Sequence, residues 1–157
     1  MTGLLALGSV SAQDDLLRKL FILTPDSILP TLSTTNRLDM MDFMDAKMRA
    51  EVTNTLSGTS EMTALTGDSL SIRMSEVLRV DMLLREAKEE ADSSHQVICV
   101  VRTYLLPSTS GQEQVVSYFS VKWNPLPYIP NLLHPLMMSP STMMREDDRL
   151  LEIKPIL

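Results

Sequence analysis

Residues 69–85 read SLSIRMSEVLRVDMLLR, and this stretch decides the fold class. Apolar residues occupy every second position in two consecutive series, which are Leu70, Ile72 and Met74, then Leu78, Val80, Met82 and Leu84. A period of two places successive side chains on opposite faces of a β-strand. The stretch therefore predicts two strands of an antiparallel sheet with one apolar face and one wet face.

Further strands are predicted on both sides of this stretch. Residues 96–106 are the most hydrophobic segment, which is typical of a central strand, and the polar residues 86–94 before them predict a hairpin loop. The turn residues 107–111 lead into a strand over residues 115–123. One side of that strand carries Val115, Phe119, Val121 and Trp123. Residues 62–66 are a further candidate, so we expect a meander of about four to six strands.

Two helices are predicted before the sheet. The first follows Asp14 and Asp15, and Pro25 ends it. Its apolar residues have helical spacing and are Leu16, Leu17, Leu20 and Phe21. The second is predicted from an N-cap at Asn36 to Val52. Its broad apolar face carries Leu38, Met41, Met44, Met48 and Val52, and the opposite side carries Phe43, Ala46 and Ala50. Because both sides are apolar, we expect this helix to be sandwiched between the sheet and another element.

The segment after the last predicted strand combines prolines with apolar residues. Five prolines between Asn124 and Ser141 argue against regular structure there. The apolar residues among them predict an extended strap packed on the body of the protein. A helical turn over residues 143–148 and a short edge strand over residues 150–153 are predicted after it. Together these elements predict an α+β fold, with N-terminal helices packed on an antiparallel meander and a proline-rich C-terminal strap.

The first residues indicate where the protein works. Leu4 to Val10 form a short apolar stretch, and the small residues Ser11 and Ala12 follow it. This order resembles the end of a signal peptide. We therefore expect residues 1–12 to be a truncated signal peptide and residues 13–157 to be a single domain, exported to the periplasm or secreted; a frayed cytoplasmic N-terminus is the alternative. No later segment approaches the ~20 apolar residues of a transmembrane helix.

Composition limits the classes of partner and cofactor. The net charge of −6 and the lack of basic clusters argue against nucleic-acid binding. The single cysteine, Cys99, lies in an apolar run and is predicted to be a buried, unreactive core residue. The two histidines, His95 and His134, have no other ligand residue at metal-binding spacing. We therefore expect neither a metal nor another cofactor.

Gly67-Asp68-Ser69-Leu70 resembles the nucleophile block of the GDSL esterases and lipases. The resemblance implies that Ser69 is a nucleophile, with an Asp-x-x-His pair near the C-terminus. Here the matching position holds Asn131-Leu132-Leu133-His134, with Asn in place of Asp, and the block does not follow the first strand of a parallel sheet. A hairpin turn that sends Leu70 into the core is favoured. A serine hydrolase using this block remains an alternative function.

The strap supplies the candidate binding surface. Aromatic and aliphatic side chains dominate protein interfaces. We expect a non-enzymatic module that binds a protein or peptide partner in the cell envelope through Tyr128, Ile129, Leu132 and Leu133. The chain also holds twelve methionines, gathered on the second helix and near the C-terminus, and the two groups are candidates to pack together. A small apolar-ligand carrier, with a cavity beside Met44 and Met48, is the third hypothesis.

Several blocks of the chain resemble a domain family of uncharacterised proteins exported by the Bacteroidales. The similar stretches are residues 25–30 (PDSILP), Asn36-Arg37-Leu38-Asp39 with the methionine-rich helix, residues 60–66 (SEMTALT), residues 97–104 and residues 115–123. The resemblance implies export beyond the inner membrane and an α+β domain. It implies no activity and no site residues.

Overall fold

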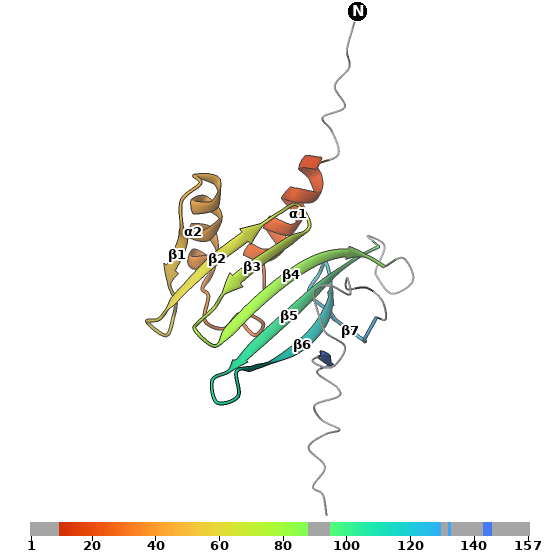
Figure 1. Ribbon diagram of the computed structural model, residues 1–157. Helices are drawn as coiled ribbons and strands as arrows, with labels where there is room; N and C mark the ends of the chain where they lie inside the picture. The colour runs from red at the N-terminus through yellow and green to blue at the C-terminus, as the bar shows by residue number, and fades with distance from the viewer. Residues whose placement is uncertain (1–9, 88–94, 130–131, 133–142, 146–157) are drawn as a thin grey trace, which may run out of the picture.

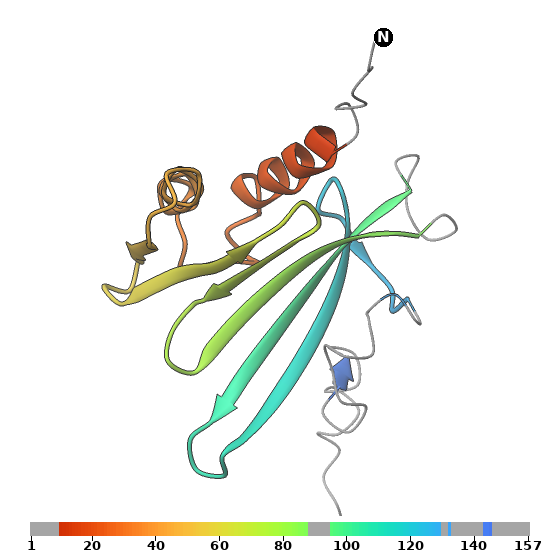
Figure 2. The ribbon, with the colours of Figure 1, turned by 45° about the horizontal axis from the view of Figure 1, so that its top comes forward.

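The structure is a computed structural model that describes residues 10–87, 95–129, 132 and 143–145. Helices α1 (Val10–Ile22) and α2 (Thr34–Asp45) come first, and strands follow. Figures 1 and 2 show both helices on one face of a twisted sheet. Residues 1–9 of the predicted signal peptide lie outside the described residues, and its last three residues begin α1.

Helix α1 forms as its sequence pattern predicts. Leu17, Leu20 and Phe21 are buried against the sheet, at the spacing that places side chains on one face of a helix. The helix ends at Ile22, three residues before Pro25. Just after the helix, the buried hydroxyl of Thr24 donates a 3.0 Å hydrogen bond to the carbonyl oxygen of Leu20. The end of α1 is thus fixed before the connection to α2 begins.

Helix α2 begins three residues earlier than predicted and ends seven residues earlier. Its N-cap is Ser33, and Asn36 is the third helical residue of a capping box in which the two residues satisfy each other's backbone N–H groups. The helix ends at Asp45, and Lys47 then adopts a left-handed φ of 54°. The predicted extension to Val52 is wrong, because residues from Ala50 onward form a strand.

The predicted apolar face of α2 is correct only in part, because Met41 is buried and Met44 packs against the core but other members are exposed. Met40 and Met41 are buried, whereas Leu38 is 44% exposed and Met48, beyond the helix, is 60% exposed. The third buried residue of the helix is Arg37, at 2% exposure. One side of α2 is therefore buried, and the expected sandwich between two elements does not form.

The sheet is an antiparallel meander in which each strand pairs with the next. Its strands are β1 (Ala50–Thr53), β2 (Thr59–Leu65), β3 (Ser69–Arg73), β4 (Leu78–Glu86), β5 (Gln96–Leu106), β6 (Gly111–Ser120) and β7 (Pro125–Leu126). A further strand, β8 (Met143–Arg145), pairs with β6 in parallel. The predicted α+β class and meander are confirmed. The sheet has more strands than expected because short strands were added at its two ends.

The face toward the helices carries the main core. The alternating residues of β3 and β4 pair in register, for example Leu70 with Met82 and Ile72 with Val80. They lie in one buried cluster with Ile98, Val100 and Phe119. The prediction of which side chains point inward is therefore correct for these strands.

The opposite face is wet over only half of the sheet. On β1–β3 it carries polar residues such as Glu61 and Arg73. On β4–β6 it carries a second buried cluster, which is Leu83, Val97, Cys99, Val101, Val116, Tyr118 and Ile129. Leu126 and Leu132 pack against this cluster. The expectation of one uniformly wet face is thus corrected, because the chain after β6 crosses behind these strands.

The C-terminal predictions are corrected in part. Pro125 and Leu126 pair with Phe119 and Tyr118, so a short strand forms where prolines argued against one. The pairing is tolerated because β7 is an edge strand. Residues 143–145 form β8 and not a helical turn. The rest of the strap and the predicted strand 150–153 lie outside the described residues, as do residues 88–94 of the predicted loop.

The two methionine groups do not meet as predicted where both are described. Met143 and Met144 pair with β6, whereas α2 contacts β1 and β2 at the other end of the sheet. Met137 and Met138 lie outside the described residues. In the part of the chain that the structure describes, no helix has the length and apolar character of a membrane span.

Candidate functional site

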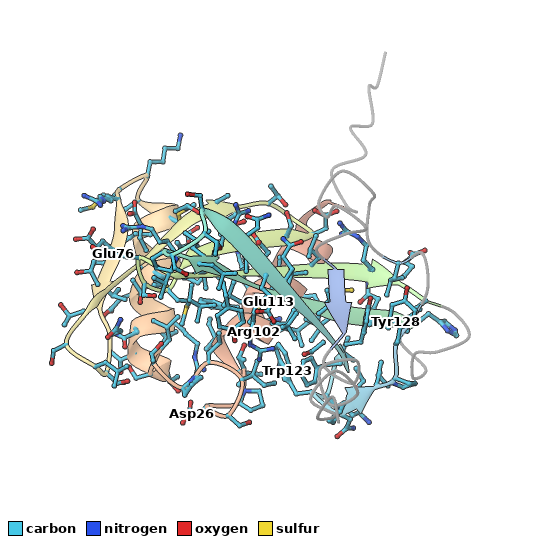
Figure 3. The ribbon with its side chains drawn as sticks, turned by 60° about the horizontal axis from the view of Figure 1, so that its bottom comes forward. Asp26, Glu76, Arg102, Glu113, Trp123 and Tyr128 are labelled. Carbon is cyan, nitrogen blue, oxygen red and sulfur yellow. The ribbon has the colours of Figure 1, made fainter. Side chains whose placement is uncertain are left out.

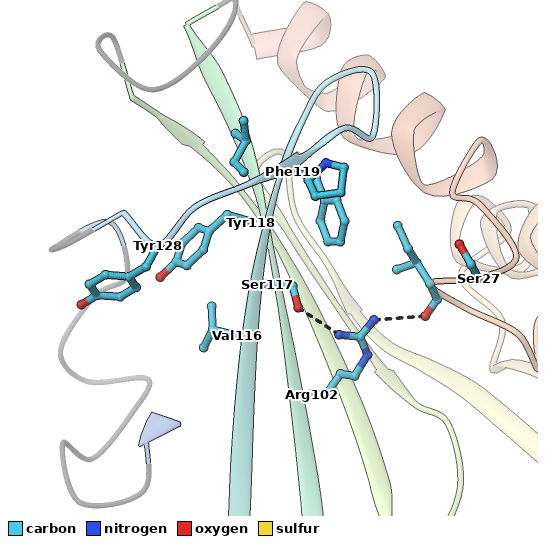
Figure 4. Close-up of a pocket in the computed structure, with 10 residues that line it drawn as sticks. Ser27, Arg102, Val116, Ser117, Tyr118, Phe119 and Tyr128 are labelled. Atoms are coloured by element: carbon cyan, nitrogen blue, oxygen red, sulfur yellow. Dashed lines mark hydrogen bonds between the residues drawn. The ribbon is translucent and has the colours of Figure 1, made fainter. Parts of the chain in front are cut away.

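A pocket of about 330 Å³ opens at the edge of β6, and we call it the edge pocket. Its lining residues are Ser27, Ile28, Arg102, Val116, Ser117, Tyr118, Phe119, Pro125, Leu126 and Tyr128. Figure 4 shows that these residues surround β6, with Arg102, Ser117 and Phe119 on one side and Val116, Tyr118 and Tyr128 on the other. The volume lies within the range of small-ligand pockets, roughly 300–1,000 Å³.

The pocket lies where two short strands meet the edge of β6. Strand β7 pairs with Tyr118 and Phe119, and β8 pairs with residues 114–116. Ser117 lies between the two pairings. The connection between α1 and α2, with Ser27 and Ile28, forms the wall on the helix side.

Arg102 is the charged residue of the edge pocket. It extends from β5, its Nη1 donates to Ser117 Oγ at 3.3 Å, and its Nη2 donates to the carbonyl oxygen of Ile28 at 3.4 Å. Both acceptors are neutral. Figure 3 shows Arg102 between Glu113 and the loop that carries Asp26. Neither carboxylate forms an ion pair with it, and its guanidinium has no acidic partner among the residues that the structure describes.

Aromatic rings form two walls of the edge pocket. Tyr118 and Tyr128 meet edge to face, with ring centroids 5.9 Å apart and an interplanar angle of 74°. On the other side, the ring of Phe119 lies 5.5 Å from that of Trp123. Tyr128 is 36% exposed, so its outer face is open to solvent. Phe119 lies on the same side of β6 as Arg102 and the two tyrosines lie on the other side, so the aromatic walls flank the strand (Figure 4).

The lining residues suit binding. A guanidinium offers planar donors that match a carboxylate or phosphate, and aromatic walls bury the rest of a ligand. The ten lining residues include no histidine, cysteine, aspartate or glutamate. They therefore supply no nucleophile and base pair of their own. Among the described residues no group of three potential metal ligands comes together.

The predicted binding residues lie in different environments. Tyr128 lines the edge pocket, and Ile129 is 6% exposed within the second core cluster. Leu132 is half-buried against that cluster, and Leu133 lies outside the described residues. The sequence reasoning missed Arg102. The signal that could have identified it is the presence of a charged residue within the most hydrophobic strand.

The Gly67-Asp68-Ser69-Leu70 block forms the turn between β2 and β3. Ser69 Oγ lies 2.8 Å from Thr66 Oγ1, which also donates to Asp68 Oδ1 at 3.0 Å. Leu70 is 1% exposed in the core, as the turn interpretation predicts. Ser69 pairs with Leu83 of β4. His95 lies further along, because its carbonyl oxygen accepts a hydrogen bond from the backbone N–H of Ala87, four residues after Leu83. That offset is on the order of 13 Å along the strand. His134 lies outside the described residues.

The cavity expected beside the methionine helix is small and is not lined by a methionine cluster. A hollow of about 200 Å³ lies beside Met44, with Arg18, Leu65, Thr66 and Gly67 as its other lining residues. Met48 points into solvent. The geometry therefore gives the carrier hypothesis no enclosed apolar chamber in the described part of the protein.

Comparisons with known proteins give a family and a fold relative. Over residues 8–149 the chain matches the family described as "Protein of unknown function (DUF3256)". A solved structure, "Structure of a domain of an uncharacterized protein from Porphyromonas gingivalis W83", is similar with a TM-score of 0.56 and 26% sequence identity. The match covers 71% of this chain and 53% of that one, so this chain spans about half the length of the solved domain. No curated protein matches.

Proposed function

This chain belongs to the DUF3256 family, whose description names no activity, and from that premise we propose that it is a non-enzymatic module that binds a protein or peptide. The resemblance to uncharacterised Bacteroidales proteins agrees with the relative from Porphyromonas gingivalis, a member of that order. The binding surface that we propose is the edge pocket, with Tyr128 as its aromatic anchor.

One observation carries the proposal. The edge pocket combines a half-buried cation that has no acidic partner among the described residues with aromatic walls. Peptide-binding sites use this combination, because apolar walls bury side chains while a fixed polar group sets orientation. Of the residues proposed from the sequence, Tyr128 keeps its binding role in this proposal. Ile129 and Leu132 support the wall from behind.

We further propose that the module works outside the cytoplasm, in the periplasm or as a secreted protein. The apolar run from Leu4 to Val10, followed by Ser11 and Ala12, supports this location. Mass spectrometry of the protein from its native host is expected to find a mature N-terminus at Gln13. An uncleaved N-terminus in the cytoplasmic fraction would contradict the proposed location.

A peptide library displayed on phage tests the binding function. Peptides selected on the wild-type protein are to be measured against Ser27→Trp, which places an indole at the exposed wall of the edge pocket. The matched control is Ser108→Trp in the exposed turn between β5 and β6. We expect Ser27→Trp to weaken binding about ten-fold or more, and Ser108→Trp to leave it unchanged. Peptides that bind all three proteins equally would exclude the edge pocket as the site.

A further inference from the structure

We infer that the group recognised in the edge pocket is a carboxylate, and that Arg102 binds it. This inference rests on the proposed peptide-binding function and names the chemistry of its ligand. The carboxylate is supplied by the C-terminus of a peptide or by the side chain of an aspartate or glutamate.

The surroundings of Arg102 leave its charge uncompensated. Its direct cross-strand neighbours are Val80 on β4 and Val115 on β6, which are 1% and 4% exposed. A charge taken out of water needs a charged or fully hydrogen-bonded partner. Arg102 has only the Ser117 hydroxyl and the Ile28 carbonyl, and a guanidinium has five N–H donors. Donors therefore remain for a ligand.

The other arginines whose side chains the structure describes differ from Arg102. The arginines with described side chains at positions 18, 37, 49, 73, 79 and 85 each lie within 3.5 Å of a carboxylate oxygen. Arg102 differs from all six, although Glu113 lies on the same face of β6, two residues from Val115. Among the arginines with described side chains, the one without an acidic partner thus lines the edge pocket.

The pocket fits a carboxylate better than a phosphate. Phosphate groups carry nearly two charges and are bound by clusters of arginines, whereas Arg102 is the single cation among the lining residues. A carboxylate carries one charge and accepts two parallel hydrogen bonds from one guanidinium. Phe119, on the same side of β6 as Arg102, then contacts the organic group that bears it.

Nuclear magnetic resonance of the arginine side chains tests this inference directly. The Nε–Hε signal of Arg102, assigned with Arg102→Lys, is to be followed while acetate or its neutral analogue acetamide is added. We expect acetate to shift this signal saturably, with a dissociation constant in the millimolar range, and acetamide to leave it in place. Ser27→Trp should abolish the saturable shift. Equal, unsaturated shifts of all arginine signals would overturn the inference.

Three peptides with a blocked N-terminus distinguish the sources of the carboxylate. The first has a free C-terminal carboxylate, the second is amidated and contains one glutamate, and the third is the same amide with glutamine. We expect one of the first two to bind about ten-fold more tightly than the glutamine amide, and Arg102→Gln to remove the difference. Equal affinities of all three peptides would overturn the carboxylate inference.

The test also separates a ligand from a partner within the chain. If acetate shifts Arg102 only after Glu113→Gln, or only after joint replacement of Glu146, Asp147 and Asp148 by their amides, the chain neutralises Arg102 itself and the inference is wrong. If library peptides depend on the edge pocket but ignore Arg102, the carboxylate inference fails while peptide binding stands. If acetate binds but no peptide depends on the pocket, the proposed function fails while the carboxylate site stands.

Discussion

Arg37 Nη1 donates a 2.7 Å hydrogen bond to the carbonyl oxygen of Thr24, so a buried arginine of α2 binds the chain just beyond the end of α1. Its Nη2 also contacts Thr34 Oγ1 at 3.0 Å and Asp26 at 3.3 Å. These contacts close the connection that carries Ser27 and Ile28. The wall of the edge pocket therefore depends on a side chain that does not line the pocket.

Replacing Arg37 with methionine tests this dependence. The substitution keeps much of the side-chain volume but leaves the buried Thr24 carbonyl without its donor, so we expect a loss of about 1–3 kcal/mol of unfolding free energy. Chemical denaturation measures the loss. Lys19→Met is the control, because the Lys19 side chain is 69% exposed, and it should change stability by less than about 0.5 kcal/mol. If the two substitutions lowered the unfolding free energy equally, the hydrogen bond between Arg37 and Thr24 would not contribute measurably to stability.

Local patterns predicted the centre of the sheet and failed at its margins. Leu70 and Val80 alternate with polar neighbours, and only a strand explains that period. Ala50 and Val52 fit two periods, because they continue the helical spacing from Ala46 and Met48, respectively, and also alternate in a strand. The left-handed residue Lys47 decides between them, and no glycine or proline marks that position.

The edge pocket was harder to predict because it is assembled from distant segments. Arg102 and Ile28 are 74 residues apart in sequence, and their hydrogen bond depends on how the helix connection lies over the sheet. Tyr128 was predicted as an exposed anchor and lines the pocket. Ile129, its neighbour, was assigned the same role from composition, but its side chain is buried in the second core cluster.

Glu61 makes stability depend on pH in the acid range. Hydrogen bonds from Arg49 and then from Arg73 lower the pKa of Glu61 below its ordinary value of 4.5. A lowered pKa adds stability above pH 4.5 that is lost as the pH falls through the folded-state pKa. We expect Glu61→Gln to be less stable than the wild type near neutral pH, with the gap closing in acid. Glu76→Gln, in the exposed turn after β3, should follow the wild-type pH profile.

Cys99 gives the opposite dependence in the alkaline range. Burial raises the pKa of its thiol to about 12 from an ordinary 9.0, although the charge of Arg85 opposes the rise. A raised pKa adds stability below pH 9 that is lost as the pH rises toward 12. The wild type should therefore lose up to roughly 1.4 kcal/mol per pH unit more than Cys99→Ala in this window. Parallel curves for the two proteins, or rapid alkylation of the native thiol, would contradict this account.

The turn at Ser69 should be structural and not catalytic. Leu70→Ala removes a fully buried side chain and should cost about 2–5 kcal/mol. Ser69→Ala removes one exposed hydrogen bond, with Thr66, and should cost about 1 kcal/mol or less. A serine-reactive phosphonate probe should label neither the wild type nor Ser69→Ala. Labelling that disappears only in Ser69→Ala would revive the hydrolase hypothesis.

Tyr128 and Ile129 are neighbours whose substitutions should separate binding from stability. Ile129→Ala opens the second core cluster and should cost about 2–5 kcal/mol. Tyr128→Ala loses an edge contact with Tyr118 and should cost only about 0.5–1.5 kcal/mol. Because Tyr128 lines the edge pocket, the same substitution should weaken peptide binding about ten-fold, and Tyr128→Phe, which keeps the ring, should restore most of it. Denaturation and binding measured on one set of variants decide the matter: if affinity falls only in proportion to lost stability, Tyr128 is a packing residue and the binding surface lies elsewhere.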